Sequence, residues 1–178
     1  REYSSERRVM ALDIVIMAAG KGTRMKSALP KVLHRLAGRS LLQHVLQTAA
    51  GLGADRIVTI TGHGAEQVEA AVRGESRVFV RQMPQLGTGH AVQQAVPALH
   101  DEGITLILNG DVPLIEAPTL RALVAACGGS DGETASPEAL CNSIGTQPKI
   151  LNGTSCGQPG QSSVILLEIV TGSGAARC

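Results

Sequence analysis

Residues 14–25, IVIMAAGKGTRM, place small and cationic side chains directly after a short apolar run. Small residues let backbone N–H groups approach a ligand closely, and nearby cations offset negative charge, a combination that suits phosphate. The small residues are Ala18, Ala19, Gly20 and Gly22, and the cations are Arg24 and Lys31. We interpret this segment as a polyphosphate cradle. The alternative is an ordinary strand-to-helix loop that carries surface cations.

The spacing of this segment excludes two well-known phosphate-binding fingerprints. The G-x-G-x-x-G motif of dinucleotide-binding proteins would need a glycine where Met25 stands, and the P-loop motif G-x-x-x-x-G-K-[ST] is not matched. The sequence therefore predicts a phosphate site of another class.

A candidate metal ligand, Asp111, lies in the stretch NGDVPL. A carboxylate beside a phosphate site repels the ligand unless a cation lies between them, and Mg²⁺ commonly does so. A turn or helix-capping aspartate is the alternative.

A candidate base-recognition loop lies at residues 81–91, RQMPQLGTGHA. Its Gln82, Gln85, Gly87 and Thr88 offer amide and backbone groups that can read the edge of a base. An ordinary loop can carry the same residues, so both interpretations stay open.

These segments must be positioned by the elements between them. Apolar runs rich in β-branched residues alternate with segments of helical spacing, which predicts an α/β domain with a parallel, buried sheet. The predicted strands are 12–17, 56–61, 77–81 and 104–108, and the predicted helices are 40–53, 65–72, 90–99 and 117–129. Ser40 and Gln43 form a capping box at the start of the first helix. In such a sheet, ligands bind at the carboxyl ends of the strands.

The composition excludes several classes of protein. The net charge of +1 argues against a nucleic-acid-coating protein, and no apolar run approaches the roughly 20 residues that cross a bilayer. The 4 cysteines contain no C-x-x-C pair, so neither a zinc site nor a redox dithiol is indicated. The first residues lack the apolar segment of a secretory signal. We expect a cytoplasmic protein, with no nucleic-acid or membrane partner, that starts at Met10.

Several stretches together resemble a known family: MAAGKGTRMKSALPKVLHRLAGRSLLQHVL, GHG, QLGTGHAVQQA and LNGDVPLI. They are similar to the N-terminal part of bacterial N-acetylglucosamine-1-phosphate uridyltransferase, one half of a bifunctional enzyme that is also a glucosamine-1-phosphate acetyltransferase. The resemblance covers about residues 11–129, and we assign residues 10–129 to the N-terminal portion of a sugar nucleotidyltransferase domain. It implies a Rossmann-like α/β fold with a parallel sheet, here truncated.

The resemblance implies a reaction. A uridylyl group passes from UTP to N-acetylglucosamine-1-phosphate, giving pyrophosphate and UDP-N-acetylglucosamine, a precursor of peptidoglycan and lipopolysaccharide. The sugar-phosphate oxygen attacks the α-phosphorus in line, with Mg²⁺ as the cofactor. Because that oxygen is already anionic, positioning and charge neutralisation supply most of the catalysis and no general base is required.

The resemblance also implies roles for individual residues. Gln82 and Gly87 would read the uracil edge. Arg24 and Lys31 would hold the triphosphate as the catalytic cations, and Asp111 would bind Mg²⁺. The implied nucleotide contacts are Met17, Ala18, Ala19, Gly20, Lys31, Gln82, Gly87, Thr88, Asn109, Gly110 and Asp111.

The resemblance ends after Gly129. Residues 130–178 are rich in Gly, Ser, Pro, Thr and Asn, with one apolar run, 164–170, that could form a strand. The family's sugar-contacting stretches, its second metal-binding residue and its hexapeptide repeats have no counterpart there. We leave this segment unassigned, as either disordered or out-of-frame sequence, and the missing acetyltransferase half leaves the oligomeric state open. A working uridylyltransferase, an inactive nucleotide-binding fragment, and another nucleotidyltransferase of this fold that uses GTP or CTP remain alternatives.

Overall fold

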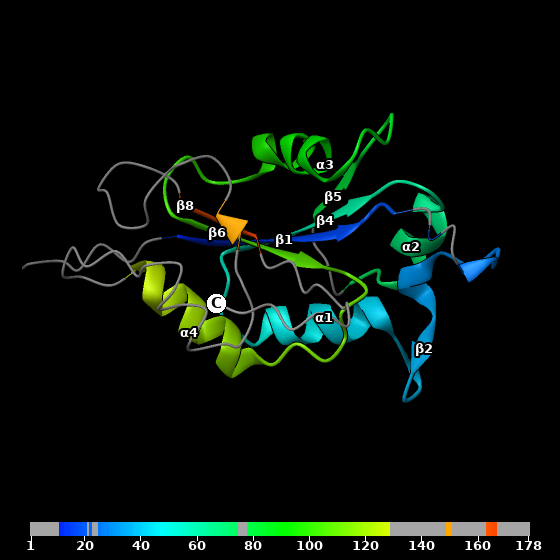
Figure 1. Cartoon of the computed structure of the whole chain (residues 1–178), viewed down its shortest axis with the longest axis horizontal. Helices are drawn as coiled ribbons and strands as arrows, with labels where there is room; N and C mark the ends of the chain where they lie inside the picture. The colour runs from blue at the N-terminus through cyan, green and yellow to red at the C-terminus, as the bar shows by residue number, and fades with distance from the viewer. Residues whose placement is uncertain are drawn as a thin grey trace, which may run out of the picture.

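The computed structural model describes residues 11–20, 22, 25–74, 78–128, 149–150 and 163–166, which form three layers around one main sheet (Figure 1). The strands of the main sheet are β1 (Leu12–Ala18), β4 (Arg56–Thr61), β5 (Val78–Arg81), β6 (Ile104–Asn109), β7 (Lys149–Ile150) and β8 (Ser163–Leu166). The helices are α1 (Leu41–Ala50), α2 (Ala65–Ala71), α3 (Thr88–Ala95) and α4 (Ala117–Gly128). Short 3₁₀ turns, η2 (Lys31–Leu33) and η3 (Val96–Ala98), and a hairpin of β2 (Arg35–Leu36) and β3 (Arg39–Ser40) complete the description.

The order of strands in the sheet, β5-β4-β1-β6-β8-β7, reverses beside β1. The chain builds β4 and β5 on one side of β1 and then crosses to β6 on the other side. All of these pairings are parallel, as is that of β6 with β8, whereas β7 pairs antiparallel with β8. In doubly wound sheets the crevice for a ligand opens at such a reversal, outside the carboxyl ends of the strands.

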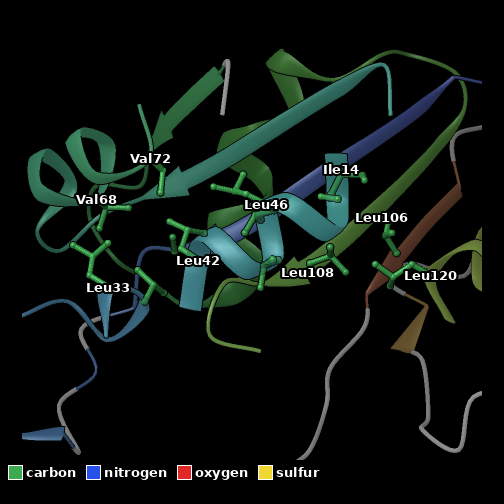
Figure 2. Packing of buried hydrophobic residues seen from close by; sticks show 14 of the residues in the cluster. Ile14, Leu33, Leu42, Leu46, Val68, Val72, Leu106, Leu108 and Leu120 are labelled. Atoms are coloured by element: carbon green, nitrogen blue, oxygen red, sulfur yellow. The ribbon is translucent and has the colours of Figure 1, made fainter. Parts of the chain in front are cut away.

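Alternating side chains of β1 point into two separate cores, as expected from the period of two along a strand. Ile14 and Ile16 pack with side chains from α1, α2 and α4 on one face (Figure 2), whereas Val15 packs with α3 on the other. Figure 1 shows α1 and α4 below the sheet and α3 above it. The sheet is therefore covered on both faces, which explains why its strands are continuous apolar runs.

The predicted capping box at the start of α1 is confirmed. The Ser40 hydroxyl accepts a hydrogen bond from the Gln43 N–H at 3.2 Å, and the Ser40 N–H donates to Gln43 Oε1 at 3.0 Å. The two bonds satisfy backbone and side-chain groups that a helix start otherwise leaves unpaired.

The prediction for α3 was wrong at both ends. The expected helix ran over residues 90–99, but α3 begins at Thr88 and ends at Ala95. The chain then continues as the 3₁₀ turn η3, which contains Pro97. Proline has no N–H to donate to the carbonyl four residues earlier, so the α-helical hydrogen-bond pattern cannot continue through Pro97.

The predicted fold class is confirmed, because every strand and helix expected between residues 12 and 129 is present and the sheet is parallel there. The sequence did not predict η2, β7 or the β2–β3 hairpin. The apolar run at 164–170 contributes its first residues to β8; its residues after Leu166 lie outside the described part. No helix in the described part of the chain has the length and hydropathy of a membrane span.

Candidate nucleotide site

A cavity of about 610 Å³ opens at the carboxyl ends of β1, β5 and β6. It thus lies where the strand order reverses. It is lined by Met17, Ala19, Gly20, Gly22, Met25, Lys31, Val32, Gln82, Gln85, Gly87, Thr88, Ala91, Asn109 and Asp111.

The loop after β1 reaches the cavity through Gly22, which has a φ of +58°. A Cβ at this position would lie 2.9 Å from the Lys31 Cβ, so the backbone approaches η2 more closely than a side chain would allow. The Gly22 carbonyl also accepts a hydrogen bond from the Met25 N–H at 2.9 Å. Glycine is therefore needed here both for its conformation and for its size.

An ion pair crosses the cavity from η2 to the end of β6. Lys31 Nζ pairs with Asp111 Oδ2, and the two side chains are 44% and 27% exposed. The residues after β6 are held beside β1 because the Gly110 N–H donates to the Met17 carbonyl at 2.9 Å. The cation predicted to hold phosphate and the carboxylate predicted to bind metal are thus direct partners.

The loop after β5 is organised by Gln82, whose side chain is almost fully buried. Its Nε2 donates to the Gly87 carbonyl at 2.9 Å and lies 3.2 Å from His90 Nδ1. The other ring nitrogen of His90, Nε2, lies 3.3 Å from Gln94 Nε2, so the imidazole sits between two side-chain amides. Gln82 therefore fixes the shape of the loop that the sequence predicted to read a base.

A bidentate ion pair braces the neighbouring strand ends outside the cavity. Glu69 of α2 accepts two hydrogen bonds from the Arg81 guanidinium, each 2.9 Å long, and a third from the Thr61 hydroxyl at 2.9 Å. The Arg81 hydrogen bond lowers the pKa of Glu69, and the partial burial of the carboxylate opposes this effect. The brace ties α2 to the last residues of β4 and β5, directly before Gly62 and Gln82.

Most of the residues that the sequence singled out lie together in this cavity. Those that line it are Met17, Ala19, Gly20, Gly22, Lys31, Gln82, Gln85, Gly87, Thr88, Asn109 and Asp111. Ala18 is buried and Gly110 lies behind the surface, and neither lines the cavity. Arg24 lies outside the described residues.

Several cavity residues were not predicted. Val32 and Ala91 line the wall, and Met25 was named only as a mismatch to a glycine motif. His90, whose Nδ1 lies 3.2 Å from Gln82 Nε2, was not assigned to the site either. The local sequence does not show which apolar residues will line a cavity, because whether they face a cavity or the core depends on how the elements pack.

The described residues fit a divalent cation that is shared with bound phosphates. Asp111 is the carboxylate that faces the cavity, and among the described residues no group of three or more His, Cys, Asp or Glu side chains could hold a metal by itself. Mg²⁺ is commonly bound through one or two carboxylates, with substrate phosphates and water as the other ligands.

A model of the MobA-like NTP transferase domain family matches residues 14–154 of this chain. Curated relatives align with the N-terminal part of the chain, about two thirds of its length. The Bifunctional protein GlmU of Methylibium petroleiphilum is 76% identical over 123 residues, and that of Albidiferax ferrireducens is 67% identical over 124. These alignments cover 67% and 66% of this chain but 27% of each relative, so the chain spans about a quarter of the relatives' length. The resemblance inferred from the motifs is confirmed.

Solved structures share the fold. A nucleotidyl transferase from Methanothermobacter thermautotroptrophicus has a TM-score of 0.56 at 26% identity, over 65% of this chain and 57% of that one. Rv0371c from Mycobacterium tuberculosis H37Rv has a TM-score of 0.56 at 25% identity, over 66% of this chain and 60% of that one. A further structure of Rv0371c, at 23% identity, is a complex with manganese.

Proposed function

The chain belongs to the MobA-like NTP transferase domain family, and we propose that it is the nucleotide-binding part of a uridylyltransferase. The proposed substrates are UTP and N-acetylglucosamine-1-phosphate, and the proposed products are UDP-N-acetylglucosamine and pyrophosphate. We place the reaction in the cytoplasm, as a supply of precursors for the cell wall.

One observation carries this proposal: a single cavity brings together three segments that lie far apart in the sequence. They are the glycine-containing loop after β1, the Gln82 loop after β5 and Asp111 after β6. The first offers N–H donors and the second offers polar groups suited to a base edge, while the third offers a carboxylate for a cation. A nucleoside triphosphate with a divalent metal requires these functions side by side.

Catalysis in this proposal rests on positioning and on charge. The attacking phosphate oxygen of the sugar-1-phosphate is already an anion, so no residue needs to remove a proton. Lys31 exchanges Asp111 for a phosphate oxygen of the nucleotide, and we assign Arg24 to the same triphosphate. When bound, the divalent cation, which we propose to be Mg²⁺, offsets the negative charge on the phosphate oxygens. Asp111 would hold it together with those phosphates.

Base recognition in this proposal belongs to Gln82 and the Gly87 backbone. Replacing Gln82 by alanine removes the hydrogen bond to the Gly87 carbonyl and would leave the edge of a bound base unpaired in the cavity. We expect the preference for UTP over ATP to fall by about 1–3 kcal/mol, the usual cost of such an unpaired group.

Calorimetric titration of UTP and ATP with Mg²⁺ into the 178-residue chain measures this preference. Gln93→Ala, on the exposed side of α3, is the matched control and should leave the preference unchanged. Equal affinity of the unaltered chain for all four nucleoside triphosphates would contradict the assignment of the loop to uracil.

A further inference from the structure

Gln85 joins two loops of the site that are far apart in the sequence. Its side-chain Nε2 donates a hydrogen bond of 2.8 Å to the carbonyl oxygen of Ala19, 66 residues earlier in the chain. Gln85 belongs to the loop after β5, whereas Ala19 directly follows β1. Both residues line the cavity, and Ala19 is buried. The contact is therefore part of the site and not a surface contact.

The position of the Gln85 amide is shaped by Gly62, which directly follows β4. A Cβ on Gly62 would collide with Gln85 Nε2 and would lie 3.0 Å from the Ala19 oxygen. The backbone of β4 thus leaves a gap that the glutamine amide fills. The absence of a side chain at Gly62 is what lets Gln85 reach Ala19.

The Ala19 carbonyl points toward β4. It accepts the Gln85 amide, and the His63 N–H, which follows β4, approaches the same oxygen at 3.4 Å. The peptide between Ala19 and Gly20 is trans, because the cis peptide bond of the described chain is Met83–Pro84. In a planar trans peptide the N–H points opposite to the carbonyl.

It follows that the Gly20 N–H points away from β4. Since β4 and β6 flank β1 on opposite sides, the N–H points to the side of β6, where Asn109 and Asp111 line the cavity. Within the described part of the chain this N–H donates to no acceptor. A Cβ on Gly20 would meet nothing within 4 Å, so the space around the donor is open.

We infer that Gln85 is a positioning residue for phosphate binding. By holding the Ala19 carbonyl, it orients the next peptide so that the Gly20 N–H faces a phosphate oxygen of the ligand before the ligand arrives. It also links the loop assigned to the base with the loop assigned to the phosphates. This inference rests on the proposed function for the identity of the ligand, but the orientation of the peptide does not depend on a ligand.

The substitution Gln85→Met tests the inference, because it keeps the length of the side chain and removes the donor. Gln93→Met is the matched control, since Gln93 lies exposed on α3. The ¹⁵N–¹H resonance of Gly20 in the ligand-free chain reports the orientation of the peptide. We expect this resonance to shift in Gln85→Met and to stay in place in Gln93→Met. An unchanged Gly20 resonance in Gln85→Met would overturn the inference.

Ligand titrations test the consequence for binding, with Mg²⁺-tripolyphosphate and free uridine as the two probes. We expect Gln85→Met to weaken tripolyphosphate binding about threefold to tenfold, the range for one lost hydrogen bond, and to leave uridine binding nearly unchanged. A general loss of structure would instead weaken both probes and lower the melting temperature.

The outcomes separate the inference from the proposed function. If the unaltered chain binds tripolyphosphate and UTP but Gln85→Met binds them equally well, the inference fails alone. If the unaltered chain binds neither ligand, the proposed function fails, and the assignment of Gln85 to phosphate binding fails with it.

Discussion

At the scale of single residues, the proposed function requires Lys31 and Asp111 to exchange each other for ligand groups. The two side chains form an ion pair, yet both are partly exposed, and partly exposed pairs contribute little to stability. A phosphate for Lys31 and a cation for Asp111 can therefore replace the pair at a small cost. In the proposed function, the pair would hold both charges in the cavity until the ligands arrive.

Substituting Lys31 by methionine removes one partner of this exchange. We expect the affinity for UTP with Mg²⁺ to fall by about 1.5–3 kcal/mol, the range for hydrogen bonds to charged groups. Arg73→Met, which removes an exposed cation after α2, should have no such effect. Calorimetry with UTP measures both variants, and an unchanged affinity in Lys31→Met would show that Lys31 does not contact phosphate.

At the scale of elements, the shape of the cavity depends on the positions of the strand ends that surround it. Each strand is short, so its carboxyl end is fixed by neighbours as well as by the sheet itself. The brace between Glu69, Arg81 and Thr61 ties α2 to the ends of β4 and β5. Its effect on stability depends on pH, because the hydrogen bond from Arg81 lowers the pKa of Glu69 in the folded chain.

A carboxylate whose pKa is lower in the folded chain stabilises the fold above its unfolded pKa and loses this effect as the pH falls through its folded pKa. We therefore expect Glu69→Gln to lower the melting temperature by a few degrees at most at neutral pH. The difference from the unaltered chain should shrink below the ordinary glutamate value of about 4.3.

Thermal unfolding followed by circular dichroism between neutral and acidic pH measures this difference. Arg81→Met removes the other partner and should show the same trend with pH. A difference in melting temperature that stayed constant into the acid range would mean that the ionised Glu69 does not stabilise the strand ends.

At the scale of the whole molecule, the described cavity is assigned to only one of the two proposed substrates. Its lining groups are assigned to a nucleotide and a cation, and no residue of the chain is assigned to the sugar phosphate. We expect residues 130–178 to hold no counterpart of the family's sugar-contacting stretches. The chain also spans about a quarter of the length of its curated relatives.

We therefore predict that the purified 178-residue chain has little or no uridylyltransferase turnover. Holding two reactants in line can contribute about 7–11 kcal/mol to catalysis, and a chain that positions only one of them loses that contribution. Pyrophosphate release from UTP and N-acetylglucosamine-1-phosphate with Mg²⁺ measures the activity. Turnover within about tenfold of a full-length relative, or about 1.4 kcal/mol in the barrier, would show that residues 130–178 complete the site.

The sequence by itself determined most of the strands and helices of this protein and the residue types that its site presents. The strands, the start of α1 at its capping box and the small residues after β1 all depend on neighbours within a few positions along the chain. Such features are local, and they were predicted at positions where the structure has them. The resemblance of the motifs also indicated which residues would meet in one site.

Only the tertiary structure decided which side chains contact each other in that site. The pairing of Lys31 with Asp111 depends on the order of the strands, because β1 and β6 become neighbours only once the sheet has formed. The contact of Gln85 with Ala19 depends in addition on the bare backbone of Gly62 between them. No local pattern encodes these contacts, since each joins segments that the chain brings together through the packing of a whole sheet.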